Sequence, residues 1–361
     1  MRCIVMAIKF VASCKSSTTK RTWFHGANMN LSRVLPFSAA SLLLLGIGCG
    51  SSPNTDTTTQ TPSAAITIYV VQNDPTTGAT SVLELPANGQ GNVTPTATLN
   101  APAYTGFTMA TVDQSGNIYV AGYVYSPALS FEILEYAAGA TGVATPTRTL
   151  TNLPDFVWAL AVDTAGQIYA EMNAQNSYTG QISVFAAGAT GNATPIRQIV
   201  GSLTQLGGGS SLAVDSSQNL YVNNELSILV FSPTATGNVT PTRIIYEATG
   251  GVTLHGLALD NSGDLFSVST AQLGSSSAIV EFAPGSSGAS VPTRTLEVPS
   301  ATFGTSVAVD AAGNLYTVDQ SSTAKYGVDV FSAGESSNSA PARTITSTAW
   351  TTSQTGQIAV R

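Results

Sequence analysis

The sequence is poor in cysteine, histidine and positive charge. It contains three cysteines and two histidines, and only 9% of its residues are charged. Beyond residue 49 there are 7 basic and 20 acidic residues, which gives that region a net charge of −13, against −7 for the whole chain. Because nucleic-acid binding depends on a cationic surface, this composition excludes a nucleic-acid partner.

The scarcity of reactive side chains excludes several kinds of active site. Beyond Cys49 there is no cysteine, His255 is the only histidine and Lys325 is the only lysine. A zinc site with several histidine or cysteine ligands is therefore excluded, and so is a disulfide framework. A serine triad would have to use His255, yet no G-x-S-x-G segment supports one, and no glycine-rich phosphate loop leads into a helix.

The N-terminal region has the pattern of an export signal. Residues 1–28 are basic and aperiodic, and we interpret them as a leader that precedes the true start at Met29. Residues 29–48 contain Arg33, a short apolar run and small residues before Cys49, as in a lipoprotein signal peptide. Ordinary signal cleavage or a short membrane anchor are the alternatives. Residues 49–65 are polar and predict a flexible tether.

Two sequence phrases alternate along residues 66–361. One is "LAVDTAGQIYA" at Leu160, which recurs with small changes at Leu212, Leu257 and Val307. The other is "ATGNATPIRQI" at Ala189, with similar segments at Ala140, Ala235 and Ser286. The aromatic residue of the first phrase and the proline of the second both recur about every 45–52 residues. Two independent markers with one period predict a repeat architecture.

Each period contains four short β-type segments, which is typical of one blade of a β-propeller. We therefore predict an all-β fold with six blades of four antiparallel strands. The first period lacks its leading strand, and Ile358, Ala359 and Val360 near the C-terminus align with Val307, Ala308 and Val309. The C-terminal strand is thus predicted to pair with the N-terminal strand in one blade and close the ring.

The repeated residues have structural roles in this scheme. The aspartate and glycine of "VDQSGN" and "VDAAGN" are suited to a tight hairpin turn, and "ATGNATP" turns the chain between the third and fourth strands. The arginines after the prolines are predicted to lie on the outer edge strand, where charge discourages unwanted pairing. Glu135–Arg148 and Glu281–Arg294 are predicted cross-strand neighbours.

The segments "LAVDSSQNLYV" and "GNIYVAG" resemble the NHL-repeat pattern, and six blades are similar to the gluconolactonase-like and TolB-like propellers. The resemblance covers about residues 66–361. The resemblance implies the fold but does not specify a function, since NHL-type propellers include both binding platforms and enzymes. The charged segment usual in NHL repeats is replaced here by "ISVF" or "ILEY".

Variable segments before the first strand and after the second strand of each blade are predicted to share one face. A rigid scaffold with one variable face places recognition there. The predicted ligand-binding residues are Phe107, Tyr123, Trp158, His255 and Phe303. Packing between blades is the alternative role for the aromatic residues.

Acidic and amide residues follow the second strands. Asp74, Glu171, Asn223 and Asp319 have oxygen ligands of the kind that Ca²⁺ takes, although solvated loop residues fit the same pattern. The gluconolactonase-like resemblance implies a metal at the ring axis, so Ca²⁺ is the one cofactor to consider.

Three functions follow from these observations. The first is a monomeric propeller, held on the bacterial outer membrane by a lipid on Cys49, that binds a protein, glycan or small ligand without catalysis. The second is a calcium-dependent lactonase-type hydrolase, and the third is a structural or assembly role.

Overall fold

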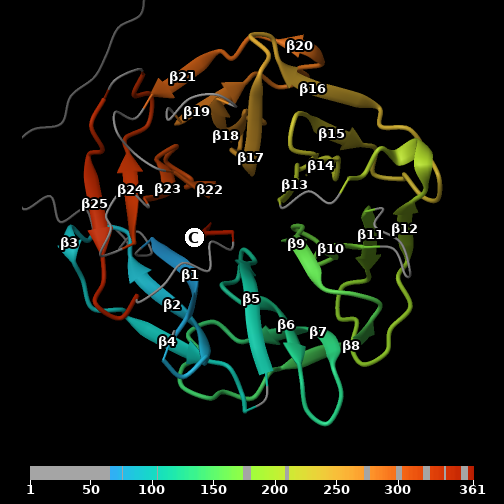
Figure 1. Ribbon diagram of the computed structural model, residues 1–361, viewed down its shortest axis with the longest axis vertical. Helices are drawn as coiled ribbons and strands as arrows, with labels where there is room; N and C mark the ends of the chain where they lie inside the picture. The colour runs from blue at the N-terminus through green and yellow to red at the C-terminus, as the bar shows by residue number, and fades with distance from the viewer. Residues whose placement is uncertain are drawn as a thin grey trace, which may run out of the picture. The chain divides into compact units, whose positions relative to one another are not determined.

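The computed structural model describes residues 66–74, 76–103, 105–173, 180–207, 211–271, 277–297, 303–319, 326–336, 339–350 and 357–361. The predictions for residues 1–65, including lipidation of Cys49, lie outside these ranges. Within them the strands form six sheets around a central axis (Figure 1). The predicted all-β, six-bladed propeller is confirmed. The described part of the chain contains no apolar helix of membrane-spanning length.

Each blade has four strands, counted outward from the axis. The inner strands are β26 (Ala359–Val360), β5 (Thr105–Val112), β9 (Val157–Val162), β13 (Leu212–Val214), β17 (Val252–Leu259) and β22 (Phe303–Val309). The second strands are β1 (Thr67–Asn73), β6 (Ile118–Val124), β10 (Ile168–Asn173), β14 (Leu220–Asn223), β18 (Leu265–Ala271) and β23 (Leu315–Asp319). We number the blades 1 to 6 in this order.

The two outer positions complete each blade. The third strands are β2 (Thr80–Pro86), β7 (Ser130–Tyr136), β11 (Gly180–Phe185), β15 (Ile228–Phe231), β19 (Ser277–Phe282) and β24 (Gly327–Phe331). The outer strands are β4 (Ala97–Asn100), β8 (Arg148–Leu153), β12 (Arg197–Val200), β16 (Arg243–Glu247), β21 (Arg294–Glu297) and β25 (Arg343–Thr346). Two short strands, β3 (Gly91–Asn92) and β20 (Gly288–Ser290), and one 3-10 turn, η1 (Ser202–Thr204), lie in connections.

The core lies between neighbouring blades rather than within one layer. Val71 and Leu99 of blade 1, for example, pack in one cluster with Phe107 and Tyr136 of blade 2. Because each sheet is covered on both faces, nearly all residues of its middle strands are buried, and most of them are apolar. This explains why the sequence shows short apolar runs instead of an apolar–polar alternation.

The two ends of the propeller meet in blade 1. β26 pairs with β1, with Ala359 opposite Tyr69 and Val360 opposite Ile68 (Figure 1). The Ile358 amide also donates to Ser306 Oγ of blade 6 at 2.8 Å. The predicted closure by the C-terminal strand is confirmed, since Ala308 pairs with Tyr316 in blade 6 as Ala359 does with Tyr69.

The repeated "ATGN" turns join neighbouring blades, which the sequence analysis did not predict. In blade 2, the Gly142 amide donates to Thr98 O of blade 1 and Gly142 O accepts from the Asn100 amide, both at 2.8 Å. Gly142 has a φ of 65°, a conformation that glycine adopts without strain. We call this contact the interblade latch. Its glycines are Gly91, Gly142, Gly191, Gly237 and Gly288.

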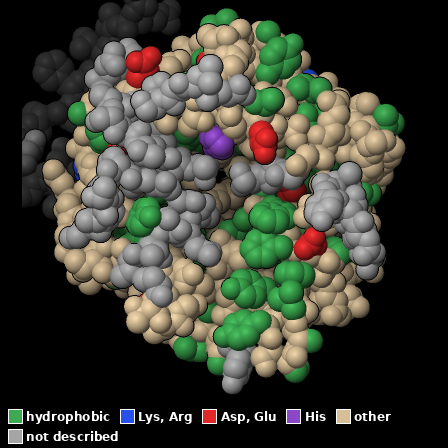
Figure 2. Space-filling model, viewed as in Figure 1, with side chains coloured by type: hydrophobic (Ala, Val, Ile, Leu, Met, Phe, Trp, Pro, Cys, Tyr) green, Lys and Arg blue, Asp and Glu red, His purple; other side chains and the backbone are tan. Residues whose placement is uncertain are grey.

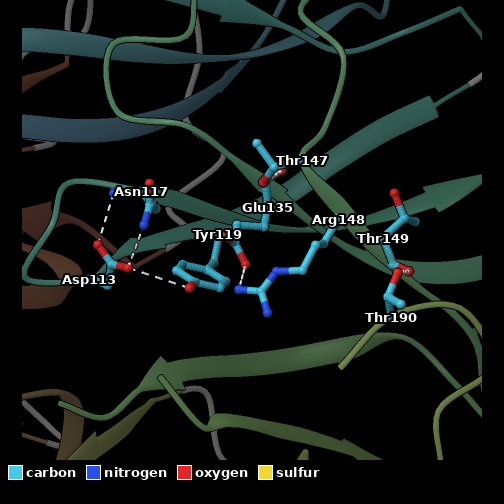
Figure 3. Close-up of polar contacts among 8 residues, drawn as sticks. All are labelled: Asp113, Asn117, Tyr119, Glu135, Thr147, Arg148, Thr149 and Thr190. Carbon is cyan, nitrogen blue, oxygen red and sulfur yellow. Dashed lines mark hydrogen bonds and ion pairs between the residues drawn. The ribbon is translucent and has the colours of Figure 1, made fainter. Parts of the chain in front are cut away.

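The interblade latch corrects the prediction that the outer strands are free edges protected by arginine. In blade 2 the outer strand β8 is bridged by Gly191 of blade 3, and the Thr190 hydroxyl donates to Thr149 O at 3.3 Å (Figure 3). Because this neighbouring turn takes up hydrogen bonds that a bare edge would leave open, it limits edge-to-edge association.

Aspartates of the first hairpin connect the turn to the blade interior. Asp113 Oδ1 accepts from the amides of Ser115 and Asn117 at 2.8 and 2.9 Å, and Oδ2 accepts from Asn117 Nδ2 and Tyr119 Oη (Figure 3). Asp310 makes the same set of bonds in blade 6, including one from Tyr316 Oη at 2.8 Å. The predicted turn role of these aspartates is confirmed.

Arginine completes this arrangement on the outer side of the aromatic ring. Arg243 lies over the Tyr221 ring, with 5.7 Å between Cζ and the centroid, and donates to Tyr221 Oη at 3.0 Å and to Ser286 O of blade 5 at 2.8 Å. The predicted Glu135–Arg148 and Glu281–Arg294 pairs are both present. The repeated aspartate, aromatic and arginine residues therefore form one structural chain from the turn to the next blade.

Candidate functional site

Five aromatic side chains form a continuous cluster across blades 2 and 3. We call it the aromatic surface; it consists of Tyr123, Tyr125, Phe131, Phe156 and Trp158. The centroid of the Phe156 ring lies 4.9 Å from that of Trp158. The centroids of the Tyr123 and Phe131 rings lie 6.3 and 6.2 Å from it. Tyr125 extends the cluster, 6.4 Å from Tyr123. Figure 2 shows hydrophobic side chains gathered on this face over the β5, β6 and β9 region.

Two rings of the aromatic surface are open to solvent. Tyr125 is 58% and Trp158 is 43% exposed, and Leu129 nearby in the chain is 64% exposed. The other three rings are half-buried and hold these two in place. Tyr and Trp at such positions are typical of ligand-contact surfaces, because they combine a large apolar face with a polar atom.

A β-bulge accounts for the exposure of Trp158. Ala159 pairs with Glu171 and Val157 with Met172, so Trp158 is the extra residue of β9 and has no partner in β10. A bulge redirects a side chain and is common next to functional sites. In blade 2, Gly106 lies opposite Tyr123, and a Cβ at Gly106 would come within 2.4 Å of the tyrosine ring. Glycine there allows the ring to lie against the backbone.

Two other predicted ligand-binding residues, Phe107 and His255, do not belong to the aromatic surface. Phe107 is fully buried and packs edge-on against Tyr136, with 6.2 Å between the centroids, so it has the interblade packing role and no surface for a ligand. His255 lies in blade 5, half-buried, with Nε2 3.2 Å from Thr270 Oγ1. The side chain of Phe303 lies outside the described residues.

Three residues of the aromatic surface were missed, although the sequence carries a signal for them. Tyr123 and Tyr125 stand at positions i and i+2, as do Phe156 and Trp158. Residues two apart in a strand project to the same side, so such pairs at the ends of neighbouring blades indicate a shared surface. Phe131 lies opposite Tyr123 in the β6–β7 pairing, which only the register reveals.

Two of the residues predicted to hold calcium form hydrogen bonds with the protein's own backbone. Asp74 Oδ1 accepts from the Thr76 and Thr77 amides at 2.8 and 3.2 Å, and these bonds lower the pKa of its carboxyl. Asn223 Nδ2 donates to Leu254 O at 2.7 Å, and Glu171 is fully buried. The side chain of Asp319 is outside the described part of the chain. Among the described residues, no three metal-ligating His, Cys, Asp or Glu side chains lie together.

A channel of about 200 Å³ lies at the ring axis between the inner strands. Among the described residues that line it, the side chains are aliphatic apart from those of Thr111 and Gln357. At the mouth formed by the first hairpins, a cavity of about 570 Å³ is lined by the turns of blades 2 to 5. The Asp113, Asp163 and Asp215 carboxylates that face this cavity are already bonded to their own turn amides.

Comparisons with known proteins identify the fold. No protein-family model matches the sequence, and a search of curated protein sequences gives no significant match. A protein of unknown function from Bacteroides caccae aligns over 82% of this chain and 99% of its own, with 9% identity and a TM-score of 0.50.

Two other solved structures align at lower TM-scores. A Lactobacillus plantarum protein has a TM-score of 0.49 at 12% identity, over 82% of this chain and 98% of its own. A proposed 6-phosphogluconolactonase from Bacteroides uniformis has a TM-score of 0.46 at 15% identity, over 77% and 82%. At these identities the similarity concerns the fold alone, and the NHL-repeat resemblance stays a prediction.

The pKa of His255 gives a test of its placement. Burial lowers this pKa, with the Glu225 carboxylate opposing the shift. When a histidine has a lower pKa in the folded than in the unfolded state, its contribution to the free energy of unfolding is fully present above the unfolded pKa of about 6.5. That contribution is lost as the pH falls through the folded pKa. We expect His255→Gln to remove this loss, so that the variant gains stability relative to the wild type between pH 7.5 and 5.5.

Urea unfolding of both proteins at the two pH values measures this difference. A stability difference that does not change with pH, or that changes in favour of the wild type on acidification, would show that His255 is not buried in this way.

Proposed function

We propose that the protein is a non-catalytic binding module that contacts a glycan through the aromatic surface. The observation that carries this proposal is the continuous cluster of five rings, two of them open to solvent, on a closed scaffold. One face of a sugar ring is made of C–H groups with slight positive charge. Such a face stacks favourably on the negative face of a tyrosine or tryptophan ring.

The size and charge of the aromatic surface support a glycan rather than a protein partner. A stable protein interface covers about 800 Å² on each side. Two open rings and Leu129 offer much less apolar area, but they suit the few sugar units of one chain. The nearby Asp155 carboxylate accepts from the Phe156 amide at 2.7 Å and so serves its own turn. Binding would therefore depend on stacking and hydroxyl contacts, with a weak dependence on salt.

The lactonase alternative has less support. It needs a metal held near the axis by Asp74, Glu171, Asn223 and Asp319. Asp74 Oδ1 and Asn223 Oδ1 already accept hydrogen bonds from backbone amides. The channel at the axis is mostly aliphatic. No particular observation favours an assembly role over binding.

Replacing either of the two open rings should weaken binding. Truncation of a central aromatic contact to alanine costs about 2 kcal/mol or more, which is a roughly thirtyfold loss of affinity. We expect Trp158→Ala and Tyr125→Ala each to reduce the retardation of the protein in gels that contain soluble polysaccharides. Because both side chains are exposed, melting temperatures should change little.

Ile196→Ala and Val143→Ala are the matched controls, since these apolar residues are 53% and 69% exposed on other segments. They should bind as the wild type does. Equal retardation of the tryptophan variant and the wild type, or turnover of a lactone by the calcium-loaded protein, would contradict the proposal.

We also propose that a lipid on Cys49 holds the propeller on the bacterial envelope, most simply on the outer membrane. The support is the signal-like sequence of residues 29–48 and the polar segment 49–65, which would give the propeller reach from the membrane. One acyl chain anchors only weakly, so stable attachment requires the several chains of a bacterial lipoprotein.

Replacement of this cysteine tests the anchor. In the native host, the wild type should partition into the detergent phase and Cys49→Ser into the aqueous phase. Ser52→Ala, in the segment 49–65, is the control and should behave as the wild type. A Cys49→Ser protein that stays in the detergent phase would contradict lipidation.

A further inference from the structure

One row of side chains, an aromatic residue on the second strand and an arginine on the outer strand, recurs in blades 2 to 6, with a glutamate between them in blades 2 and 5 and a valine in the others, and blade 1 departs from it. The row crosses the second, third and outer strands at paired positions, so its side chains lie on one face of the sheet. In blade 2 it is Tyr119, Glu135 and Arg148 (Figure 3). In blade 1 it is Tyr69, Glu84 and Ala97. The equivalent outer residues of the other blades are Arg197, Arg243, Arg294 and Arg343.

In blade 5 the arginine of this row has three contacts, each suited to a guanidinium group. Arg294 forms an ion pair with Glu281 at 2.6 Å and lies over the Phe266 ring at 5.6 Å. It also donates to Glu335 O of the next blade at 3.0 Å. The planar, multiply donating guanidinium satisfies carboxylate, ring face and carbonyl together, which no other side chain does as well.

Blade 1 keeps the carboxylate and the ring without the cation. Glu84 is 8% exposed and its Oε1 has no hydrogen-bond partner, while Tyr69 is 5% exposed. Among the described residues Glu84 forms no ion pair, and burial raises its pKa. The charge of Arg361 influences the pKa of Tyr69. The Nε of Arg361, however, donates to Gln114 O of blade 2 at 3.0 Å.

The backbone of blade 1 has the same geometry as that of blade 2. The amide and hydroxyl of Thr96 donate to Glu84 O at 2.8 and 3.2 Å, and those of Thr147 donate to Glu135 O at 2.7 and 3.0 Å. The strands are therefore in equivalent places, and the blades differ because the Ala97 side chain ends at Cβ. The half-buried Ala97 also leaves this position open toward solvent. In blade 2 the Arg148 side chain is 28% exposed, so a group in the equivalent place can be reached from outside.

We propose that Glu84, Tyr69 and Ala97 form a binding site for a guanidinium group supplied from outside the chain. The carboxylate of Glu84 pairs with the group and the Tyr69 ring supports its face, as Glu281 and Phe266 do for Arg294 in blade 5. The guanidinium comes either from a small molecule or from the arginine side chain of a peptide. This site lies in blade 1 and is independent of the aromatic surface.

Calorimetric titration of the full chain with methylguanidinium chloride tests the proposal, with sodium chloride at equal ionic strength as the control. The wild type should bind one equivalent. Ala97→Arg should lose at least about tenfold in affinity because its own side chain fills the site, and Glu84→Gln should lose as much because it removes the charge. Arg148→Ala reproduces the blade 1 row in blade 2, so it should bind two equivalents.

Each outcome bears on the proposal. No saturable binding to the wild type, or equal binding to Ala97→Arg, overturns it, and binding to Arg148→Ala alone shows that the site of blade 1 is closed. If Glu84→Gln folds poorly, Ala97→Arg remains decisive, since it adds an ion pair and should melt no lower than the wild type. The peptide Gly-Arg-Gly binding at least as tightly as methylguanidinium indicates a peptide source, and binding of methylguanidinium alone indicates a small molecule.

Discussion

The structure depends on the closure of the ring. Each blade buries its two faces only against neighbouring blades, so a missing neighbour would expose an apolar sheet. Two strand pairings close the ring, one within blade 1 and one between blades 1 and 6. β26 supplies the inner strand of blade 1, and β3 of the first period pairs with β25 of the last. Segments from the two ends of the propeller sequence are thus bonded both near the axis and at the rim.

The repeated residues maintain this closed ring, which explains why the chain repeats them so closely. The aspartate orders the turn, the aromatic ring carries its hydrogen bond inward, and the arginine reaches a carbonyl of the next blade. The interblade latch adds a pair of backbone bonds between neighbours. Since these residues are occupied with each other, the face formed by the first hairpins is structural. The opposite face is free to vary, and the aromatic surface lies there.

Departures from the repeat are the most informative positions. Gln218 takes the left-handed turn position, at a φ of 63°, that glycine holds in blades 2, 3, 5 and 6, and its side chain donates to Asp163 of blade 3 at 3.2 Å. The bulge in β9 turns Trp158 outward. In blade 1, Ala97 stands where the other blades have arginine. A departure is informative because the equivalent residues of the other blades show the usual structural role of that position.

Much of the fold could be predicted from the sequence because its signals are local and repeated. The period, the Asp–Gly turns and the Glu135–Arg148 and Glu281–Arg294 pairs all follow from spacing within one blade. Contacts between blades could not be predicted, because they depend on how sheets pack. The role of Gly142 as a latch belongs to this class. For Phe107, the sequence left ligand binding and packing between blades as alternatives, and the structure shows it buried. The aromatic surface was half predicted: Tyr123 and Trp158 were identified, but Phe156, which connects them, was not.

Removal of the closing strand tests this account most directly. A chain that ends at Thr355 lacks β26, the buried Ile358 and Ala359, and the bond to Ser306. The buried side chains alone contribute about 3 kcal/mol. The account predicts a melting temperature lower by several degrees and association through the exposed edge of β1, seen by calorimetry and light scattering. An unchanged melting temperature with a monodisperse monomer would contradict it.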